Sequence, residues 1–247
     1  MGIILKITEL SELELLHGSI TLIFILISFA IGFIFLFKYY STNRIEYITL
    51  GLSWIFLSSA WWGSSFSFLS ILFINKPLDD FTYILLGNVF LPVAVVCWIY
   101  SISHLLYTNK EKVIVFVFLI ICVPYDISII ILLLINPSLV GKKIAIFNYT
   151  PSPYAMAFQI FAGLVALITG IIFSIKSLKM ENKKIKIHAK LLLIAFLSFN
   201  IAALLDSILP LSEIPLVIIR VILISSAIEY YFGWFLPKRL EKLLINE

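Results

Sequence analysis

Residues 214–234 read IPLVIIRVILISSAIEYYFGW, an apolar stretch long enough to cross a lipid bilayer as a helix. Two ionisable residues, Arg220 and Glu229, interrupt it. A charge near the middle of a membrane costs about 2.5–3.5 kcal/mol, so such side chains tend to face neighbouring helices and to pair there. This stretch therefore predicts one helix of a transmembrane bundle.

The rest of the chain repeats this pattern. Of its 247 residues, 62% are hydrophobic and 13% are charged, and the mean hydropathy is +1.09, far from the values of soluble domains. Apolar runs of about 20 residues or more cover roughly 18–40, 47–73, 79–107, 113–135, 152–175, 189–209 and 214–236. We expect an all-α, polytopic membrane protein in which residues 1–247 form a single bundle of seven transmembrane helices.

The distribution of Lys and Arg predicts the orientation of the chain. Thirteen of these residues fall on the face that holds the C-terminus, and four fall on the face that holds the N-terminus. Because basic residues in short loops resist translocation, we expect the N-terminus outside, the C-terminus in the cytoplasm and a multi-pass location in the cell membrane. The net charge of +4 then reflects contact with membrane lipids, and we expect no nucleic-acid partner.

Four segments outside the apolar runs carry predictions of their own. We expect residues 1–17 to form a short outer segment without a cleavable signal, and 237–247 to form a short amphipathic inner helix through Leu240, Leu243 and Leu244. The basic inner loop 176–190 is either a solvated anchor or a docking site for a cytoplasmic signalling protein. The outer loop contains KKIAIFNY at 142–149, whose alternation predicts a strand or hairpin over the outer mouth.

Polar residues inside the apolar runs gather at one depth. A rise of about 1.5 Å per residue places Asn88, Asp126, Gln159, Asp206 and Arg220 within about 5–13 Å of the outer ends of their helices. The pair Trp61 and Trp62 lies near the middle of the second run, away from the interfaces where Trp usually lies. Together these seven residues predict an outward-opening pocket that binds a small or lipidic ligand.

The two charges of residues 214–234 have different predicted surroundings. Arg220 pairs with Asp206 on the preceding helix or with Asp126, and this pair either holds two helices together or contacts ligand. Glu229 faces the opposite side of its helix. We expect Ser225 and Ser226 beside it, with His104 and Asn200 as candidate companions, in either a structural or a switching role.

Enzyme motifs are missing from the sequence. It contains no HExxH motif, no Gly-rich phosphate loop and no convincing nucleophile elbow, and its seventh apolar run has no Lys for a retinal Schiff base. We therefore expect no enzymatic activity, no metal site and no cofactor.

Four stretches resemble the seven-helix sensor region found N-terminal to some prokaryotic histidine kinases. They are NRIEYITLGLSWIFLSSAWW at 43–62, LGNVFLPVAVVCWIYSISHLLY at 86–107, LLLINPSL at 132–139 and YYFGWFLPKR at 230–239. The resemblance implies a receptor-like topology and a role in sensing ligands or the state of the membrane. No kinase follows Lys242 in this sequence, so we expect signalling through a separate cytoplasmic partner.

Two functions therefore remain from the sequence. The first is a receptor-like sensor, in which a ligand in the outer pocket shifts the last two helices. The second is a proton- or ion-coupled carrier, in which Asp126, Asp206 and Glu229 serve as successive protonatable stations.

Overall fold

The computed structural model describes residues 5–209 and 212–237. The chain divides into two compact units, unit 1 from Met1 to Ala162 and unit 2 from Gly163 to Glu247. Helices make up most of both units, and the described part of unit 1 also contains a two-stranded hairpin.

Seven helices in the described part of the chain are long and apolar enough to cross a membrane. These candidate spans are Glu12–Thr42, Ile45–Ile74, Asp80–Leu106, Thr108–Ile135, Pro153–Leu178, Lys183–Ile208 and Glu213–Trp234. The prediction of seven long apolar helices is confirmed, and the ends of each helix lie within six residues of its predicted run.

The first helix begins earlier than the sequence analysis placed it. Helix α1 runs from Glu12 to Thr42, after a 3₁₀ turn at Ile7–Glu9. Ser11 caps it, because its side chain accepts from the backbone N–H of Glu14 while the Glu14 carboxylate accepts from the backbone N–H of Ser11. This reciprocal capping box starts the helix inside the segment 1–17 that we expected to precede it.

The second and third candidate spans are both interrupted. Helices α2 (Ile45–Leu57) and α3 (Trp62–Ile74) are separated by the 3₁₀ segment Ser58–Trp61, and α4 (Asp80–Asn88) and α5 (Leu91–Leu106) by a turn at 89–90. Pro92, in the first turn of α5, has no N–H to continue the helical ladder. The two interruptions lie side by side: a Cβ at Gly87 would be 3.8 Å from the carbonyl oxygen of Ala60.

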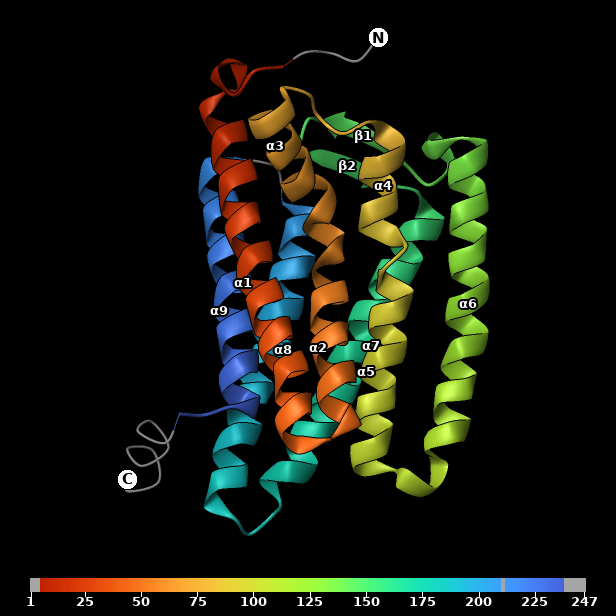
Figure 1. Ribbon diagram of the computed structural model, residues 1–247, viewed down its shortest axis with the longest axis vertical. Coiled ribbons are helices and arrows are strands. Elements are labelled where there is room, and N and C mark those ends of the chain that lie inside the picture. Colours follow the sequence, from red (N-terminus) through yellow and green to blue (C-terminus); the bar gives the residue numbers. More distant parts are fainter. Residues whose placement is uncertain (1–4, 210–211, 238–247) are drawn as a thin grey trace. The chain divides into compact units, whose positions relative to one another are not determined.

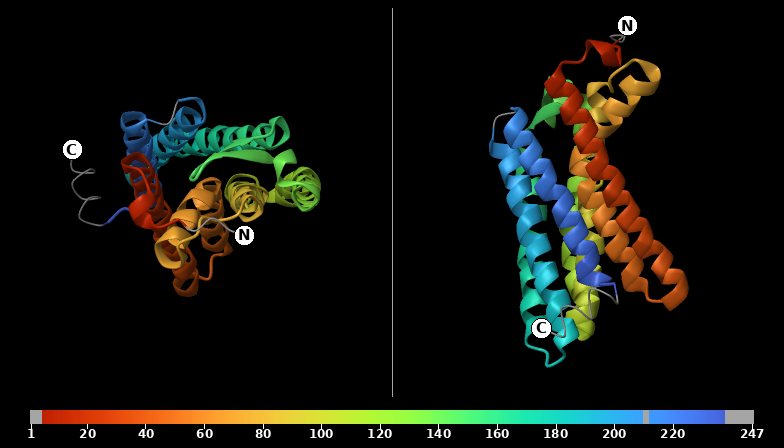
Figure 2. Two further views of the ribbon diagram at one scale, coloured as in Figure 1. Left: turned by 90° about the horizontal axis from the view of Figure 1, so that it is seen from above. Right: turned by 90° about the vertical axis from the view of Figure 1, so that its left-hand side faces the viewer.

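Helices α1 and α2 approach closely at two glycines. A Cβ at Gly32 would lie 2.3 Å from Cγ1 of Ile55, and a Cβ at Gly51 would lie 2.7 Å from the carbonyl oxygen of Gly32. Figure 2 shows α1 running alongside α2 and α3. Small residues at such a crossing let two helix backbones touch, as is typical of helices packed in membranes.

A 3₁₀ turn at Thr108–Lys110 connects α5 to α6 (Glu111–Ile135), and a second turn at Pro137–Leu139 leads from α6 to the hairpin. Strands β1 (Gly141–Ala145) and β2 (Asn148–Pro151) pair antiparallel, with Gly141 opposite Pro151. The hairpin lies in unit 1 at the same end as the start of α4 (Figure 1). The prediction of a strand or hairpin within 142–149 is confirmed.

The tip of the hairpin is buried in unit 1. Phe147 is 2% exposed and packs in a cluster with Leu10, Phe68 and Ile71. Its ring meets that of Phe68 edge to face at 6.0 Å and that of His17 at the same distance. Because an aromatic side chain buries a large apolar surface, Phe147 anchors the loop to the helices.

In unit 2, helices α8 (Lys183–Ile208) and α9 (Glu213–Trp234) form the main contact. Gly233 of α9 accommodates Leu192 of α8, since a Cβ at Gly233 would lie 2.5 Å from Cγ of Leu192. The part of α7 (Pro153–Leu178) that belongs to unit 2 packs on α8 in the same way, with Gly170 against the ring of Phe196.

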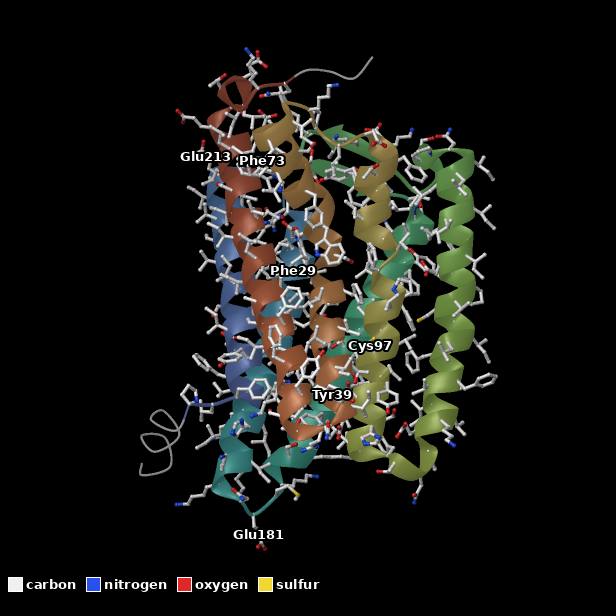
Figure 3. All side chains as sticks on the ribbon, viewed as in Figure 1. Phe29, Tyr39, Phe73, Cys97, Glu181 and Glu213 are labelled. Carbon is white, nitrogen blue, oxygen red and sulfur yellow. The ribbon has the colours of Figure 1, made fainter. Side chains whose placement is uncertain are left out.

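Two sequence predictions concern segments between and after these helices. Most of the basic stretch 176–190 is helical, with a short loop at 179–182 that contains Glu181 (Figure 3) and ends at Asn182, whose side chain caps α8. The predicted C-terminal helix 237–247, with Leu240, Leu243 and Leu244, lies outside the described residues except for Pro237.

The glycine crossing gives a stability prediction. We expect Gly51→Ala to lower the free energy of unfolding by about 1–3 kcal/mol, because the added methyl meets the backbone of α1, which cannot move aside locally. The measurement is a thermal melt of the purified chain in detergent, followed by circular dichroism. Gly87→Ala is the matched control, since its methyl would find only contacts of 3.5 Å or more, and equal destabilisation by both changes would contradict the close crossing.

Candidate functional site

Three side chains meet in a hydrogen-bonded group that we call the amide–tyrosine cluster: Asn88, Tyr149 and Gln159. The Tyr149 hydroxyl accepts from Nε2 of Gln159 at 2.8 Å and from Nδ2 of Asn88 at 3.2 Å. Nε2 of Gln159 also donates to Oδ1 of Asn88 at 3.2 Å. The amides of Asn88 and Gln159, 71 residues apart in sequence, therefore converge on the hydroxyl oxygen of Tyr149.

Local structure explains how each member of the cluster is placed. Asn88 is the last residue of α4, and its fully buried side chain also donates to the carbonyl of Ile84. Tyr149 belongs to β2, and Gln159 lies in the second turn of α7, a few residues after the hairpin. The interruption between α4 and α5 ends α4 at Asn88, and the Tyr149 hydroxyl lies beside Gly87, 3.5 Å from where a Cβ would be.

The Tyr149 hydroxyl remains neutral in this site. Burial raises its pKa above the ordinary value, and hydrogen bonds from Gln159 and Asn88 offset only part of this effect. The phenol oxygen thus accepts from two amides. A site with two N–H donors aimed at one position is suited to a neutral acceptor oxygen.

Further contacts attach the hairpin to α3, to α4 and to the segment between them. Ser64 of α3 donates to the carbonyl of Phe147 at 2.7 Å and shares a hydrogen bond with the Tyr83 hydroxyl at 2.8 Å. Lys143 of β1 donates to the carbonyl of Leu78 at 2.9 Å, and its ammonium lies 5.0 Å from the Tyr83 ring centroid. Burial lowers the pKa of Lys143.

Two polar atoms on α6 lie buried without a hydrogen-bond partner among the described residues: Oη of Tyr125 and Oδ1 of Asp126. The Tyr125 ring stacks on Phe158, with ring centroids 3.7 Å apart. Its hydroxyl is close enough to Tyr149 for an electrostatic interaction. Buried polar atoms are nearly always satisfied in folded proteins, so these two are candidate contacts for a bound molecule.

The predicted pair Trp61 and Trp62 is buried among aromatic rings. Trp61 meets Phe24 edge to face at 5.4 Å. The ring centroid of Trp62 lies 5.3 Å from that of Phe29, which is labelled in Figure 3, and 4.9 Å from that of Phe90. The indole N–H of Trp62 donates to the hydroxyl of Ser58 at 3.1 Å. Ala60, the residue before Trp61, has its carbonyl oxygen 3.8 Å from where a Cβ at Gly87 would lie.

Arg220 pairs with Asp206 in unit 2. Nη1 of Arg220 donates to Oδ1 of Asp206 at 2.8 Å, and the arginine side chain is 2% exposed. Of the two alternatives that the sequence left open, Asp206 is the observed partner. Asp206 and Arg220 belong to unit 2, whereas Trp61, Trp62, Asn88, Asp126 and Gln159 belong to unit 1.

The predicted companions of Glu229 are wrong in part. Ser225 donates to Oε1 of Glu229 at 2.7 Å, as expected, but the second partner is Ser198 of α8, which donates to Oε2 at 2.7 Å. Asn200 instead donates to the carbonyl of Phe196. Ser198 takes the place because it lies on the face of α8 that meets α9.

His104 also has other partners than Glu229. Its Nδ1 lies 2.7 Å from Glu111, at the start of α6, and its Nε2 lies 3.6 Å from Glu46, which also pairs with Arg44 at 3.0 Å. The short turn between α5 and α6 brings Glu111 back onto His104 within seven residues. His104 therefore joins the ends of α2, α5 and α6 within unit 1.

Sequence reasoning missed Tyr149 and Ser198. The predicted hairpin included Tyr149, but its alternation alone did not show which side chain would reach the helix amides. Depth alone did not identify Ser198 as the side chain opposite Glu229.

The cluster predicts a hydrogen-bond cost for Tyr149→Phe. We expect this change to lower the free energy of unfolding by about 1–3 kcal/mol, because the buried Asn88 amide and the half-buried Gln159 amide lose their shared acceptor. The measurement is a denaturant or thermal melt in detergent. Tyr154→Phe, at a tyrosine that is 45% exposed and bonds Ser128, is the control; a loss as large as that of Tyr149→Phe would contradict the cluster's role.

Comparison of the chain with protein-family models and with curated proteins finds no match. The resemblance to the sensor regions of histidine kinases therefore stays a prediction from the sequence, and a functional proposal depends on the geometry of the candidate site.

Proposed function

We propose that this chain is a receptor-like sensor of the cell membrane, with its N-terminus outside and its C-terminus in the cytoplasm. A small or lipidic ligand binds at the amide–tyrosine cluster, and binding is signalled to a separate cytoplasmic protein. The asymmetry of Lys and Arg supports the orientation. The amide–tyrosine cluster supports the ligand site.

One observation carries this proposal. The Tyr149 hydroxyl, supplied by the hairpin, occupies the position at which the Asn88 and Gln159 amides converge. A ligand oxygen that takes the same position replaces both hydrogen bonds and frees the hairpin. Loops on a rigid helical scaffold are where binding functions concentrate, and here the loop competes with ligand for one pair of donors.

The ligand chemistry follows from the surrounding groups. Two amide donors select a neutral acceptor oxygen, such as a hydroxyl or carbonyl group, and the unpartnered atoms of Tyr125 and Asp126 offer a further donor and acceptor. Trp61 and Trp62, buried among aromatic rings of the same unit, provide apolar surface. An amphiphile with a polar head and an apolar body fits this combination.

The interrupted spans give a route for the signal. Release of the hairpin changes the contacts of α4, which ends at the interruption beside Ser58–Trp61. Stretches of 3₁₀ helix within a longer helix often mark hinges. In this proposal the basic stretch 176–190 docks the cytoplasmic partner.

A second candidate function is a proton- or ion-coupled carrier. Discontinuous helices that meet at one depth are typical of transporter binding sites, and the neighbouring interruptions of the second and third candidate spans favour this function. Asp126, Asp206 and Glu229 are then the protonatable stations.

A co-purification experiment tests the sensor proposal. The wild-type chain and the Asn88→Ala/Gln159→Ala double variant are purified in mild detergent, and bound small molecules are extracted and identified by mass spectrometry. We expect at least one hydroxyl- or carbonyl-bearing amphiphile that the double variant loses. Ser138→Ala, on an exposed turn outside the cluster, should retain it, and identical extracts from all three proteins would refute the ligand site.

A flux assay separates the two functions. The same amphiphile is loaded into liposomes that contain the wild-type chain, and its release is followed with and without a proton gradient. The sensor proposal expects no release above protein-free liposomes. Gradient-dependent release that Glu229→Gln abolishes would establish the carrier instead.

A further inference from the structure

The carboxyl group of Asp126 lies within α6 and has no basic partner in the described part of the chain. Its Oδ1 atom is buried and forms no hydrogen bond with the described residues. The ion pairs of the described part of unit 1 involve Glu46 and Glu111 instead. An unpaired carboxylate in an apolar span is costly, and such groups usually pair with a positive group. A positive group of a bound molecule is therefore suited to this place.

A second unpartnered atom belongs to the neighbouring residue. The side chain of Tyr125 is 5% exposed, and its Oη atom is buried without a hydrogen-bond partner within residues 5–209 and 212–237. This hydroxyl is close enough to Asp126 and to Tyr149 for electrostatic interactions. A phenol oxygen accepts hydrogen bonds while its O–H donates one. Asp126 and Tyr125 thus present two acceptor oxygens and one hydroxyl hydrogen to a common neighbourhood.

Aromatic rings of α6 and α7 surround Tyr125. Its ring stacks on that of Phe158 with centroids 3.7 Å apart, and it lies 5.3 Å from the ring of Tyr154. The Tyr154 hydroxyl already shares a hydrogen bond with Ser128 at 2.6 Å. These rings offer apolar surface for an alkyl chain, and aromatic rings also attract cations.

We infer that Asp126 and Tyr125 bind an organic ammonium group. The ligand is then an amphiphilic amine that carries a hydroxyl or carbonyl oxygen next to its ammonium group. This inference rests on the proposed ligand site at the amide–tyrosine cluster and names the class of its ligand. The ammonium N–H groups donate to Oδ1 of Asp126 and to Oη of Tyr125, and the O–H of Tyr125 donates to the ligand oxygen that Asn88 and Gln159 bind.

A neutral ligand would leave part of this site unused. A hydroxyl group has one hydrogen, which reaches either Asp126 or Tyr125 but not both, and it brings no positive charge. Lys143 of the hairpin does not supply that charge either, because its ammonium donates to the carbonyl of Leu78. An ammonium group provides several N–H donors together with the charge that the carboxylate lacks.

Binding of two matched amphiphiles to the complete chain in detergent tests this inference. Both have a twelve-carbon chain: one ends in adjacent amine and hydroxyl groups, and the other ends in two adjacent hydroxyl groups. We expect the amino alcohol to raise Tm at a lower concentration than the diol does, because a ligand that binds the folded state more tightly stabilises it more. Equal effects of the two compounds, or no saturable effect of either, would overturn the ammonium site.

Variants assign the preference for the amine to Asp126. Asp126→Asn should weaken binding of the amino alcohol about tenfold, equivalent to ~1.4 kcal/mol, with a smaller effect on the diol. Tyr125→Phe should also weaken binding of the amino alcohol, although it removes no charge. Asp80→Asn is the matched control, since it removes the same charge from an exposed position at the start of α4, and it should bind both compounds as the wild type does. An undiminished preference for the amine in Asp126→Asn would contradict the inference.

The Asn88→Ala/Gln159→Ala double variant separates this inference from the proposed function. It should weaken binding of both compounds, because each carries the oxygen that the two amides bind. If it does so while the wild type shows no preference for the amine, the ammonium site is refuted and the ligand site stands. If it binds both compounds as the wild type does, the ligand site is refuted, whereas a preference for the amine that Asp126→Asn removes would still place the ammonium group at Asp126.

Discussion

Polar groups on apolar helices have to find their partners within the protein, and this constraint shapes both units. In lipid, no water is available to replace a missing hydrogen bond, so each polar side chain is either paired or costly. Arg220 meets Asp206, and Glu229 meets Ser198 and Ser225. The same requirement gathers Asn88, Gln159 and Tyr149 around one oxygen atom.

The hairpin illustrates how this constraint connects fold to function. A loop that only covered the helices would bury apolar side chains such as Phe147 and leave the helix amides to one another. Here β2 supplies the oxygen on which two helix amides converge. The hairpin is therefore part of the polar core of unit 1, and whatever competes for these donors acts on the hairpin and on the interruption that ends α4.

Hydrophobic length and depth were enough to predict the helices and part of the cluster. Seven apolar runs correspond to seven helices, and counting residues from the helix ends placed Asn88 and Gln159 at one level, where they do meet. Depth could not choose between partners on different helices, so Glu229 was matched with His104 and Asn200 when Ser198 faces it. The contribution of Tyr149 depends on how the two strands of the hairpin pair. The start of α1 depends on a capping box at Ser11, which a hydropathy pattern does not detect.

Hydrogen–deuterium exchange of the hairpin amides, Gly141–Pro151, tests most directly whether the amide–tyrosine cluster holds the hairpin closed. The exchange is compared between the wild type and Gln159→Ala in the same detergent, by mass spectrometry of the peptides. The account predicts faster exchange in the hairpin and in the last turn of α4 of the variant, with α8 and α9 unchanged. Unchanged exchange in the hairpin would contradict it, because the loop would then be held without the cluster.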